Sequence, residues 1–422
     1  MITAPGLPES VSAWCHSGMA LLSGPRHDPP ILPTRNMIDA ISHLADDVAE
    51  AFGLAGSPLH MLADRAALLG LRRGGAWSCG RACRIVRAED GWIAVNLARP
   101  DDFDLIPAWL GSRPSWPAVM RTIGRRCVAE LLDDAWELGL AVSGVNEAPT
   151  QTQCPAERGV NRVFFAKPGG HRDCAHDPPL IIDLSSLWAG PLCGSLLAQA
   201  GARVVKIESE RRPDPIRETC PPHFDLLNGG KESVVLDLQS AAGRRQLLAL
   251  VASADAVITS ARPRALAQLG LAPEVLFARK ESLTWVAITG HGWSGDQANR
   301  IGFGDDAAIA GGLMIVMPDG SPGFLGDAIA DPLSGLTAAL GALDAIRKGG
   351  GVLLDVGMSR VSRFLAQAGD PTPDYAIMKS GRHWTATNGL STQRLSHPVA
   401  PRATMAARPL GADTASVLAG LS

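Results

Sequence analysis

The alternation of short apolar runs with helical patterns between residues 180 and 358 constrains the fold of this chain most strongly. Six runs rich in Val, Ile and Leu have the length of buried strands, and helical patterns separate them. The predicted strands cover 180–184, 203–208, 233–237, 256–259, 284–289 and 352–356, and the clearest helices cover 192–200 and 241–252. Such alternation favours parallel strands with helices on both faces. The sequence therefore predicts an α/β fold with a doubly wound, mainly parallel sheet.

A smaller unit precedes this core. Two strand-like runs at 83–87 and 92–97 are joined through Asp90-Gly91, a dipeptide typical of tight hairpins, and helical patterns follow them. The chain then becomes polar and rich in Pro, Gly and Asp, without periodicity. We therefore predict a helical segment at 1–72, a small α+β domain at 73–150, a linker at 151–179, the core at 180–365, and at 366–422 a tail that is loop as far as residue 396 and ends in a closing helix.

Composition argues against several classes of function. The formal net charge is −3, so no overall basic field favours nucleic acid or an anionic membrane. The sequence lacks an apolar run of about 18 residues and an N-terminal signal peptide, which favours a cytoplasmic protein. The eight cysteines are scattered, and Cys79 and Cys83 have no second pair at zinc spacing, so we expect free thiols and no metal site.

Asp331 stands at the start of the strongest helical pattern in the chain. We interpret Asp331 as the N-cap and Pro332 as the first helical residue. Apolar residues then recur on one face, at Leu333, Leu336, Leu340 and Leu343. A carboxylate there faces unpaired N–H groups and the positive end of the helix dipole. We therefore expect Asp331 to be ionised at neutral pH and able to act as an oxygen nucleophile, although a capping role alone would also explain it.

The segment around Asp331 has a parallel near the N-terminus. The spacing from Pro30 to Asp39 equals the spacing from Pro322 to Asp331, and similar residues precede both prolines. We interpret the N-terminal segment as a partial repeat of the core. Asp39 would then be the degenerate copy, because it falls within a helical pattern and not before a proline.

The first strand, helix and second strand of the core mimic a Rossmann-like dinucleotide-binding unit, and the second strand ends in an acidic residue, Glu208. Gly190 and Gly194 do not have the spacing of the glycine fingerprint, however. A nicotinamide-dependent dehydrogenase is therefore an alternative, but the absence of its glycine fingerprint argues against it.

A series of short motifs carries a more specific resemblance. In the core they are Ile182-Asp183-Leu184-Ser185 with Ala189-Gly190-Pro191, the segment 201–208, the segment 228–238, Arg262-Pro263 with Leu269-Gly270-Leu271, Thr289-Gly290-His291-Gly292, and Ala330-Asp331 with Gly335. Through these motifs the chain resembles the family III CoA transferases, which include formyl-CoA transferase, carnitine CoA-transferase and α-methylacyl-CoA racemase. In that family the small domain follows the core, whereas here the matching segment precedes it.

The resemblance implies a mechanism and partners. Asp331 occupies the position of the family's nucleophilic aspartate, which forms an aspartyl-CoA intermediate while CoA moves from an acyl-CoA thioester to a carboxylic acid. Coenzyme A and acyl-CoA would be substrates, and the resemblance implies no permanently bound cofactor. The family also forms interlocked, ring-like dimers, so we expect a homodimer.

The resemblance also assigns residues to CoA binding. They are Leu187, Trp188, Ala189, Leu236, Ser260, Ala261, Arg262 and Leu269, with Arg300 among the basic side chains able to meet the phosphates. The family usually has Asn-Phe where this chain has Ser260-Ala261, which would weaken contacts to the adenine.

Two alternatives remain open from the sequence. The altered pocket suggests a CoA-binding or dimer-partner protein that has lost catalysis. A racemase-like enzyme would need a second acid–base group, yet Phe303 aligns with the family's histidine, and His291 is the one nearby replacement. The acyl donor and acceptor are not specified by these motifs.

Overall fold

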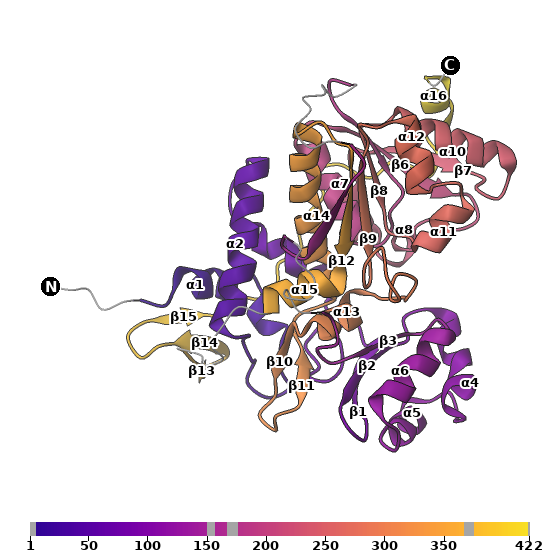
Figure 1. Ribbon diagram of the computed structural model, residues 1–422. Coiled ribbons are helices and arrows are strands. Elements are labelled where there is room, and N and C mark those ends of the chain that lie inside the picture. The colour runs from indigo at the N-terminus through magenta and orange to yellow at the C-terminus, as the bar shows by residue number, and fades with distance from the viewer. Residues whose placement is uncertain (1–5, 150–156, 167–175, 367–374, 421–422) are drawn as a thin grey trace.

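The computed structural model describes residues 6–149, 157–166, 176–366 and 375–420, and a seven-stranded sheet lies at its centre (Figure 1). The strand order is β4-β12-β9-β8-β5-β6-β7, and all pairs are parallel except β4 with β12. The strands are β4 (Val160–Phe164), β5 (Leu180–Asp183), β6 (Arg203–Ser209), β7 (Glu232–Leu236), β8 (Ala256–Thr259), β9 (Thr284–Thr289) and β12 (Val352–Gly357). The six strands predicted from the sequence are confirmed, and so is the mainly parallel α/β fold.

Helices cover both faces of this sheet. Successive side chains of a strand point to opposite faces, so neighbouring residues of one strand pack against different helices. Ile181 packs in one core with α7 (Ala189–Gln199), α9 (Pro221–Asn228), α14 (Ala330–Arg347) and α15 (Met358–Ala366). Its neighbour Ile182 packs in the other, with α10 (Ala241–Ser253), α11 (Pro263–Gln268) and α12 (Pro273–Arg279). A short helix, α8 (Ile216–Thr219), follows β6.

A glycine lets α14 approach α7 closely. A Cβ atom added at Gly335 would lie 2.7 Å from the carbonyl oxygen of Ala189, closer than real Cβ contacts. Any side chain at residue 335 would therefore push the two helices apart. The close contact brings the start of α14, which carries Asp331, beside the start of α7.

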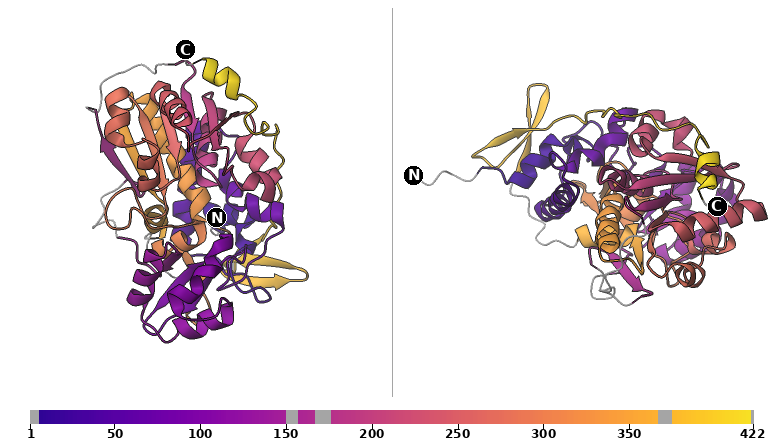
Figure 2. Two further views of the ribbon diagram at one scale, coloured as in Figure 1. Left: turned by 90° about the vertical axis from the view of Figure 1, so that its right-hand side faces the viewer. Right: turned by 90° about the horizontal axis from the view of Figure 1, so that it is seen from above.

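The N-terminal segment packs along α14 as a group of helices (Figures 1 and 2). It contains α1 (Glu9–His16), the 3₁₀ turns η1 (Met19–Leu21) and η2 (Pro58–Ala63), α2 (Arg35–Phe52) and α3 (Asp64–Leu69). Helices α2 and α14 have 18 residues each and contact one another. Asp39 lies within α2 and accepts a hydrogen bond from the Ser10 hydroxyl at 2.5 Å. The repeat stays a prediction, and Asp39 has a local structural partner.

A small unit lies beside the core at the lower right of Figure 1. Strands β1 (Cys83–Arg87), β2 (Trp92–Asn96) and β3 (Ala141–Gly144) form an antiparallel sheet, which is covered by η3 (Pro100–Leu105), α4 (Ile106–Leu110), α5 (Trp116–Ile123) and α6 (Val128–Glu137). Helix α13 (Gly304–Gly311) of the core packs on β2 and β3, next to the hairpin of β10 (Met314–Val316) and β11 (Pro322–Phe324). The predicted hairpin at residues 83–97 is confirmed.

Two stretches predicted to be irregular contain strands. The predicted linker, 151–179, includes β4, and the predicted loop before residue 396 includes the antiparallel strands β13 (Ala376–Ser380), β14 (His383–Thr387) and β15 (Thr392–Arg394). Only Val160 of β4 and Ala386 of β13–β15 are buried, so these strands lack the buried apolar run by which the core strands were predicted. The closing helix is present as α16 (Thr414–Ala419), which packs on β7.

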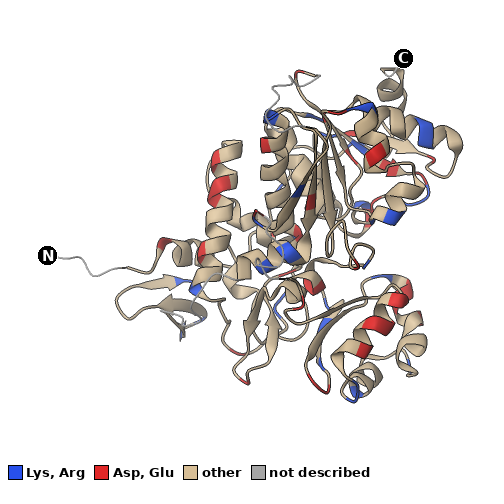
Figure 3. Ribbon diagram, in the orientation of Figure 1, with Lys and Arg blue, Asp and Glu red and all other residues tan. Residues whose placement is uncertain are grey.

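Charged residues of both signs are interspersed over all these parts (Figure 3). None of the described helices has both the length and the apolar character to cross a membrane.

Candidate active site

The order of the strands marks a crevice at the carboxyl end of the sheet. From β5 the chain moves outward to β6 and β7, and then returns to place β8 on the other side of β5. The loops after β5 and β8 therefore diverge, and ligands of doubly wound proteins bind at such a switch point. A cavity of about 350 Å³ lies there.

One wall of this cavity consists of the two diverging loops. The loop after β5 contributes Ser186, Leu187 and Ala189, and the loop after β8 contributes Ser260, Ala261 and Arg262. The Ser186 N–H donates to the Ser260 hydroxyl at 3.1 Å, which ties the loops together. Five of these six residues were assigned to CoA binding by sequence resemblance, and Ser186 was not.

Buried charges fix the loop after β5. The Lys206 ammonium donates to the Ser185 carbonyl at 2.9 Å and to Asp214 at 3.2 Å, and Asp214 in turn accepts from the Leu187 N–H. Leu187 has a φ of 68°, a left-handed conformation that is uncommon outside glycine. The hydrogen bonds hold this strained residue at the cavity wall.

Asp331 forms the opposite wall and is the one carboxylate among the described lining residues. It is not the N-cap: α14 begins at Ala330, so Asp331 and Pro332 are the second and third helical residues. Its N–H is not unpaired, because it donates to the Ala328 carbonyl at 2.9 Å. The N-cap prediction is wrong by two residues, because the Asp-Pro pair lies inside the first turn and not at its edge.

Gly304, the first residue of α13, lies directly against this carboxylate. A Cβ atom at residue 304 would fall 2.3 Å from Asp331 Oδ2 and 2.4 Å from the Ala328 carbonyl oxygen. No positive φ requires a glycine there. The space that Gly304 leaves empty is therefore what allows the Asp331 side chain its position.

Asp331 belongs to a cluster of four aspartates. Asp327 is fully buried and binds the Arg65 guanidinium through both oxygens, at 2.8 and 2.7 Å. Asp305 accepts from the Ala328 N–H at 2.9 Å, and Asp306 accepts from the Asn96 amide at 2.8 Å. Arg65 comes from α3 of the N-terminal segment, so distant parts of the chain complete the cluster.

This environment contradicts the expectation that Asp331 is ionised at neutral pH. Burial raises the pKa of Asp331 to about 7, the Arg65 charge opposes this rise, and the other three aspartates add to it. Burial likewise raises the pKa of Asp306 to about 7 and that of Asp305 to about 6. The removal of water and the repulsion between like charges outweigh the helix dipole. The pKa of Asp331 therefore lies far above the usual range of an aspartate and close to neutral pH.

The end of β9 brings a glycine loop to the cavity floor. Gly290 lies against the backbone of Gly302, since a Cβ atom on either would fall within about 3 Å of the other. Gly290, Gly302 and Phe303 line the cavity, whereas His291 is buried and does not. Burial and the nearby Arg300 and Arg360 charges keep the pKa of His291 well below its usual value.

Three of the predicted binding residues do not reach the cavity. Trp188 is buried edge-on against His223, with ring centroids 5.0 Å apart. Leu236 is buried in β7, two strands away from β5, and Leu269 packs against the core below α11. Side chains of adjacent residues point to different sides of a loop or strand. Sequence alignment can therefore place a residue near the crevice although its side chain does not face the crevice.

Arg300 lines the cavity but its charge is already paired. It contacts Glu147 at 2.5 Å, and its guanidinium carbon lies 3.6 Å from the centroid of the Trp136 ring. Arg99 of the small unit also lines the cavity and pairs with Asp102 at 2.5 Å. Arg262 has no acidic partner among the described residues and is the most available cation for an anionic ligand.

Sequence reasoning missed Arg65, Arg99 and the supporting aspartates. Asp327 stands four residues before Asp331, and Asp305 and Asp306 form an acidic pair, but neither arrangement has a spacing specific to a site. Arg65 and Arg99 lie far away in sequence, so no local pattern could reveal them.

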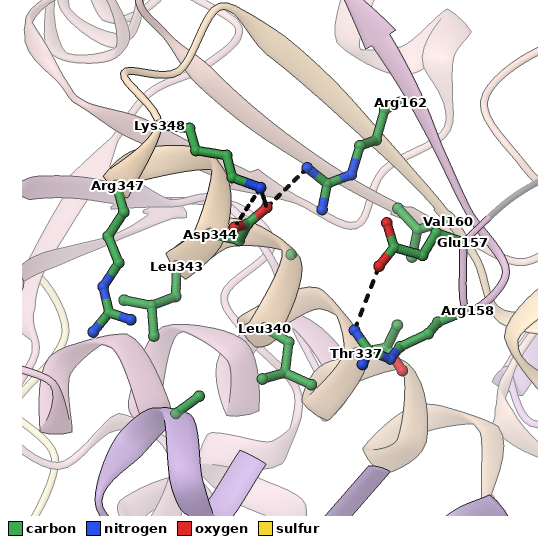
Figure 4. Close-up of a pocket in the computed structure, with 12 residues that line it drawn as sticks. Glu157, Arg158, Val160, Arg162, Thr337, Leu340, Leu343, Asp344, Arg347 and Lys348 are labelled. Atoms are coloured by element: carbon green, nitrogen blue, oxygen red, sulfur yellow. Dashed lines mark hydrogen bonds and ion pairs between the residues drawn. The ribbon is translucent and has the colours of Figure 1, made fainter. Parts of the chain in front are cut away.

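A second cavity, of about 410 Å³, lies between α14, the end of α2, and β4 with the residues that precede it (Figure 4). Most of its charges are paired: Asp344 with Lys348 and Arg162, and Arg158 with Glu157 and Asp47. We therefore interpret it as a surface groove between elements. The described residues contain no group of acidic, histidine or cysteine side chains that could hold a metal ion.

The core of this chain is similar in sequence to known CoA-transferases. Residues 180–386 match the family model described as CoA-transferase family III. A succinyl-CoA–D-citramalate CoA-transferase of Chloroflexus aurantiacus is 33% identical over 195 residues, which cover 43% of this chain and 48% of that protein. A succinate–glutarate CoA-transferase of Agrobacterium fabrum is 32% identical over 204 residues, covering 43% of this chain and 51% of that protein.

Solved structures match about half of this chain, a share similar to that matched by the two relatives above. A CAIB/BAIF family protein from Brucella suis is 27% identical and covers 51% of this chain and 66% of that chain, with a TM-score of 0.44. The chain spans about half the length of the curated relatives that it matches.

Proposed function

Because the chain belongs to CoA-transferase family III through residues 180–386, we propose that it moves CoA from an acyl-CoA thioester to a carboxylic acid through an aspartyl-CoA intermediate on Asp331. The observation that carries this proposal is the position of Asp331 as the one carboxylate among the described residues lining the cavity at the switch point. No histidine accompanies the hydroxyl groups of that lining to activate them as nucleophiles.

The proposed reaction proceeds by carboxylate attack. An oxygen of ionised Asp331 attacks the thioester carbonyl, and CoA leaves as a thiolate, which gives a mixed anhydride. The thiolate then attacks the Asp331 carbonyl carbon and releases the acyl group as a carboxylate. An incoming carboxylate reverses these two steps and leaves with CoA, so Asp331 is regenerated without consuming water. The partly enclosed cavity supports this path, because water would hydrolyse the anhydride.

The cavity also supports a location for each part of the substrate. The loops at Ser186–Ala189 and Ser260–Arg262 would hold CoA, with Arg262 against a phosphate. Phe303 and Met358 offer an apolar surface beside Asp331 for the acyl group. Trp188, Leu236 and Leu269 would support these loops from below without touching the ligand.

The racemase-like alternative receives less support. Proton exchange at the α-carbon requires a second acid–base group facing Asp331, and Phe303 lines that side of the cavity. His291 is buried outside the lining, and its lowered pKa leaves it unprotonated at neutral pH.

We also propose that the enzyme is a homodimer, interlocked as in its family, and that it works in the cytoplasm, where CoA thioesters and its buried free thiols would be stable. Light scattering on the purified chain tests the dimer: a mass near 44 kDa would contradict it.

The function itself is tested by trapping the adduct. The chain is incubated with succinyl-CoA and a panel of dicarboxylates, treated with hydroxylamine, and analysed by peptide mass spectrometry. We expect a hydroxamate on Asp331 and CoA exchange that falls at least about a thousandfold in Asp331→Ala. The control, Asp344→Ala, alters an aspartate of the same helix that lies outside the cavity, and should retain activity.

Adduct formation without exchange would favour the catalytically impaired alternative. Binding of CoA without any adduct would favour a CoA-binding protein. Full exchange activity in Asp331→Ala would exclude Asp331 as the nucleophile.

A further inference from the structure

A cavity of about 450 Å³ lies between the N-terminal segment and the sheet of β13–β15, and it shares no lining residue with the cavity at the switch point. Four pieces of chain surround it: the loop after η1, helix α3 with the residues that follow it, strand β14, and the residues after β15. The family match does not include the first two pieces. The proposed transferase chemistry uses none of this lining.

The lining of this cavity is strongly basic. Its charged or titratable side chains are Arg26, His27, Arg72, Arg73, Arg382 and His397, and the described lining contains no acidic residue. The whole chain has three more acidic than basic residues, so a cavity with four arginines departs sharply from the average. Such a concentration of positive charge attracts anions.

Three of these arginines are available to a ligand. Arg26, Arg72 and Arg382 have exposed side chains and make no hydrogen bond or ion pair with another described residue. Arg73 has a different task, since it donates to the backbone carbonyls of Leu21, Pro25 and Asp28. It thereby fixes the loop that presents Arg26 and His27 to the cavity. The Asp28 carboxylate is exposed nearby but does not line the cavity.

The rest of the lining is apolar and includes an aromatic ring. Leu21, Leu22 and Leu71 form part of the wall, and the first two are buried in the core. Trp384 of β14 is half-buried, with the Lys379 ammonium 5.7 Å from its ring centroid. A small inorganic anion would leave this apolar surface wet, whereas a ligand with a flat ring would cover it.

We propose that this cavity is a binding site for a phosphorylated nucleotide, with a diphosphate on the arginines and the base against Trp384 and the leucines. Guanidinium groups bind phosphate oxygens in pairs, and several converging arginines match a diphosphate better than a single carboxylate. The volume lies within the range of small-molecule sites. The site is separate from the one proposed for CoA, and the inference does not rest on the transferase function.

Calorimetry on the whole chain at low salt tests the proposal with ADP, adenosine and pyrophosphate. We expect ADP to bind more tightly than either fragment, with a dissociation constant below about 1 mM. Arg72→Ala and Arg382→Ala should each weaken ADP binding by roughly tenfold, because each removes a charge-assisted contact from an exposed position that is not needed for folding.

Two controls separate this site from the CoA cavity, since CoA itself contains an adenosine diphosphate group. Arg262→Ala alters the other cavity and should leave unchanged the part of ADP binding that Arg72→Ala and Arg382→Ala weaken, and CoA exchange should persist in Arg72→Ala. If Arg262→Ala removes ADP binding and Arg72→Ala does not, ADP binds only at the CoA cavity and the proposal fails. Pyrophosphate binding as tight as that of ADP, or no saturable binding up to about 5 mM ADP, would also overturn it.

Discussion

Two buried charge clusters flank the start of α7, and they differ in how their charges are balanced. Behind the loop after β5, two carboxylates meet two ammonium groups: Asp183 pairs with Lys231 at 2.8 Å, and Asp214 pairs with Lys206 at 3.2 Å. Lys231 also donates to a carbonyl oxygen and a side-chain amide oxygen, and Lys206 to a carbonyl. Beside the cavity, four aspartates share Arg65.

The electrostatic outcome differs between Asp183 and Asp331, whereas burial raises the pKa of Asp214 in spite of Lys206. Burial raises the pKa of Asp183, but Lys231 and Lys206 outweigh it and hold the pKa below the usual value. Burial raises the pKa of Asp331 to about 7, and the one arginine does not restore it. A cluster with equal numbers of positive and negative charges stabilises one arrangement of the loop. A cluster with an excess of carboxyl groups instead holds the pKa of one of them close to neutral pH. The proposed function assigns the reactive role to the unbalanced cluster.

The largest expected effect comes from breaking the balanced cluster. Asp183→Ala leaves the Lys231 ammonium buried without its carboxylate, and we expect a loss of about 3–5 kcal/mol in the free energy of unfolding. Urea denaturation measures it. Asp331→Ala relieves repulsion and should change stability by less than about 1 kcal/mol. Equal losses in the two variants would contradict the comparison.

The geometry of the reactive cluster is tested at Gly304. Gly304→Ala inserts a methyl group 2.3 Å from Asp331 Oδ2 and 2.4 Å from the Ala328 carbonyl oxygen, so both the carboxylate and the backbone before α14 must shift. We expect CoA exchange to fall by roughly 10–100-fold while the far-ultraviolet spectrum stays unchanged. Unchanged turnover would mean that the position of Asp331 is not critical.

The pH dependence sharpens the comparison further. If ionised Asp331 is the nucleophile, kcat/KM should fall about tenfold for each pH unit below 7 and level off above pH 8. Asp305 raises the pKa of Asp331, so Asp305→Asn should move the whole profile to lower pH. A profile that does not move would show that Asp305 has no electrostatic influence on the reaction.

The smallest expected effect concerns stability. The native pKa of Asp306 is about 7, above its unfolded value, so its contribution to stability is complete below about pH 4 and is lost as pH rises through 7. Asp306→Asn cannot ionise, and its oxygen can still accept from Asn96. We expect the variant to match the parent at pH 4 and to be more stable at pH 8 by about 1 kcal/mol. Thermal melts at both pH values measure this, and a less stable variant at pH 8 would disprove the explanation.

The sequence predicts the core of the fold well, because buried parallel strands need continuous apolar runs such as that of β9. Strand β4 escapes prediction because it lies at the sheet edge, with one buried side chain. The domain boundaries drawn from the sequence stay predictions.

The site is predictable only in part. The loops after β5 and β8 follow from strand order, but Trp188 turns inward next to Leu187, whose positive φ redirects the backbone. The protonation of Asp331 depends on Asp305, Asp306 and Arg65, whose approach is set by packing and not by local sequence.

The pairing of Arg65 with Asp327 has a consequence for how the chain folds. The two residues are separated by 262 positions, so the first helices leave the ribosome long before their partner exists. Contacts between residues so far apart in sequence slow folding. The apolar faces of α1–α3 stay exposed until α14, against which they pack, has been synthesised. We therefore expect the four aspartates and Arg65 to come together late in folding. The core at 180–365, synthesised by itself, would lack Arg65, the cation that offsets the repulsion between these aspartates. The N-terminal segment, which the family match does not include, would thus complete the acid cluster late in folding.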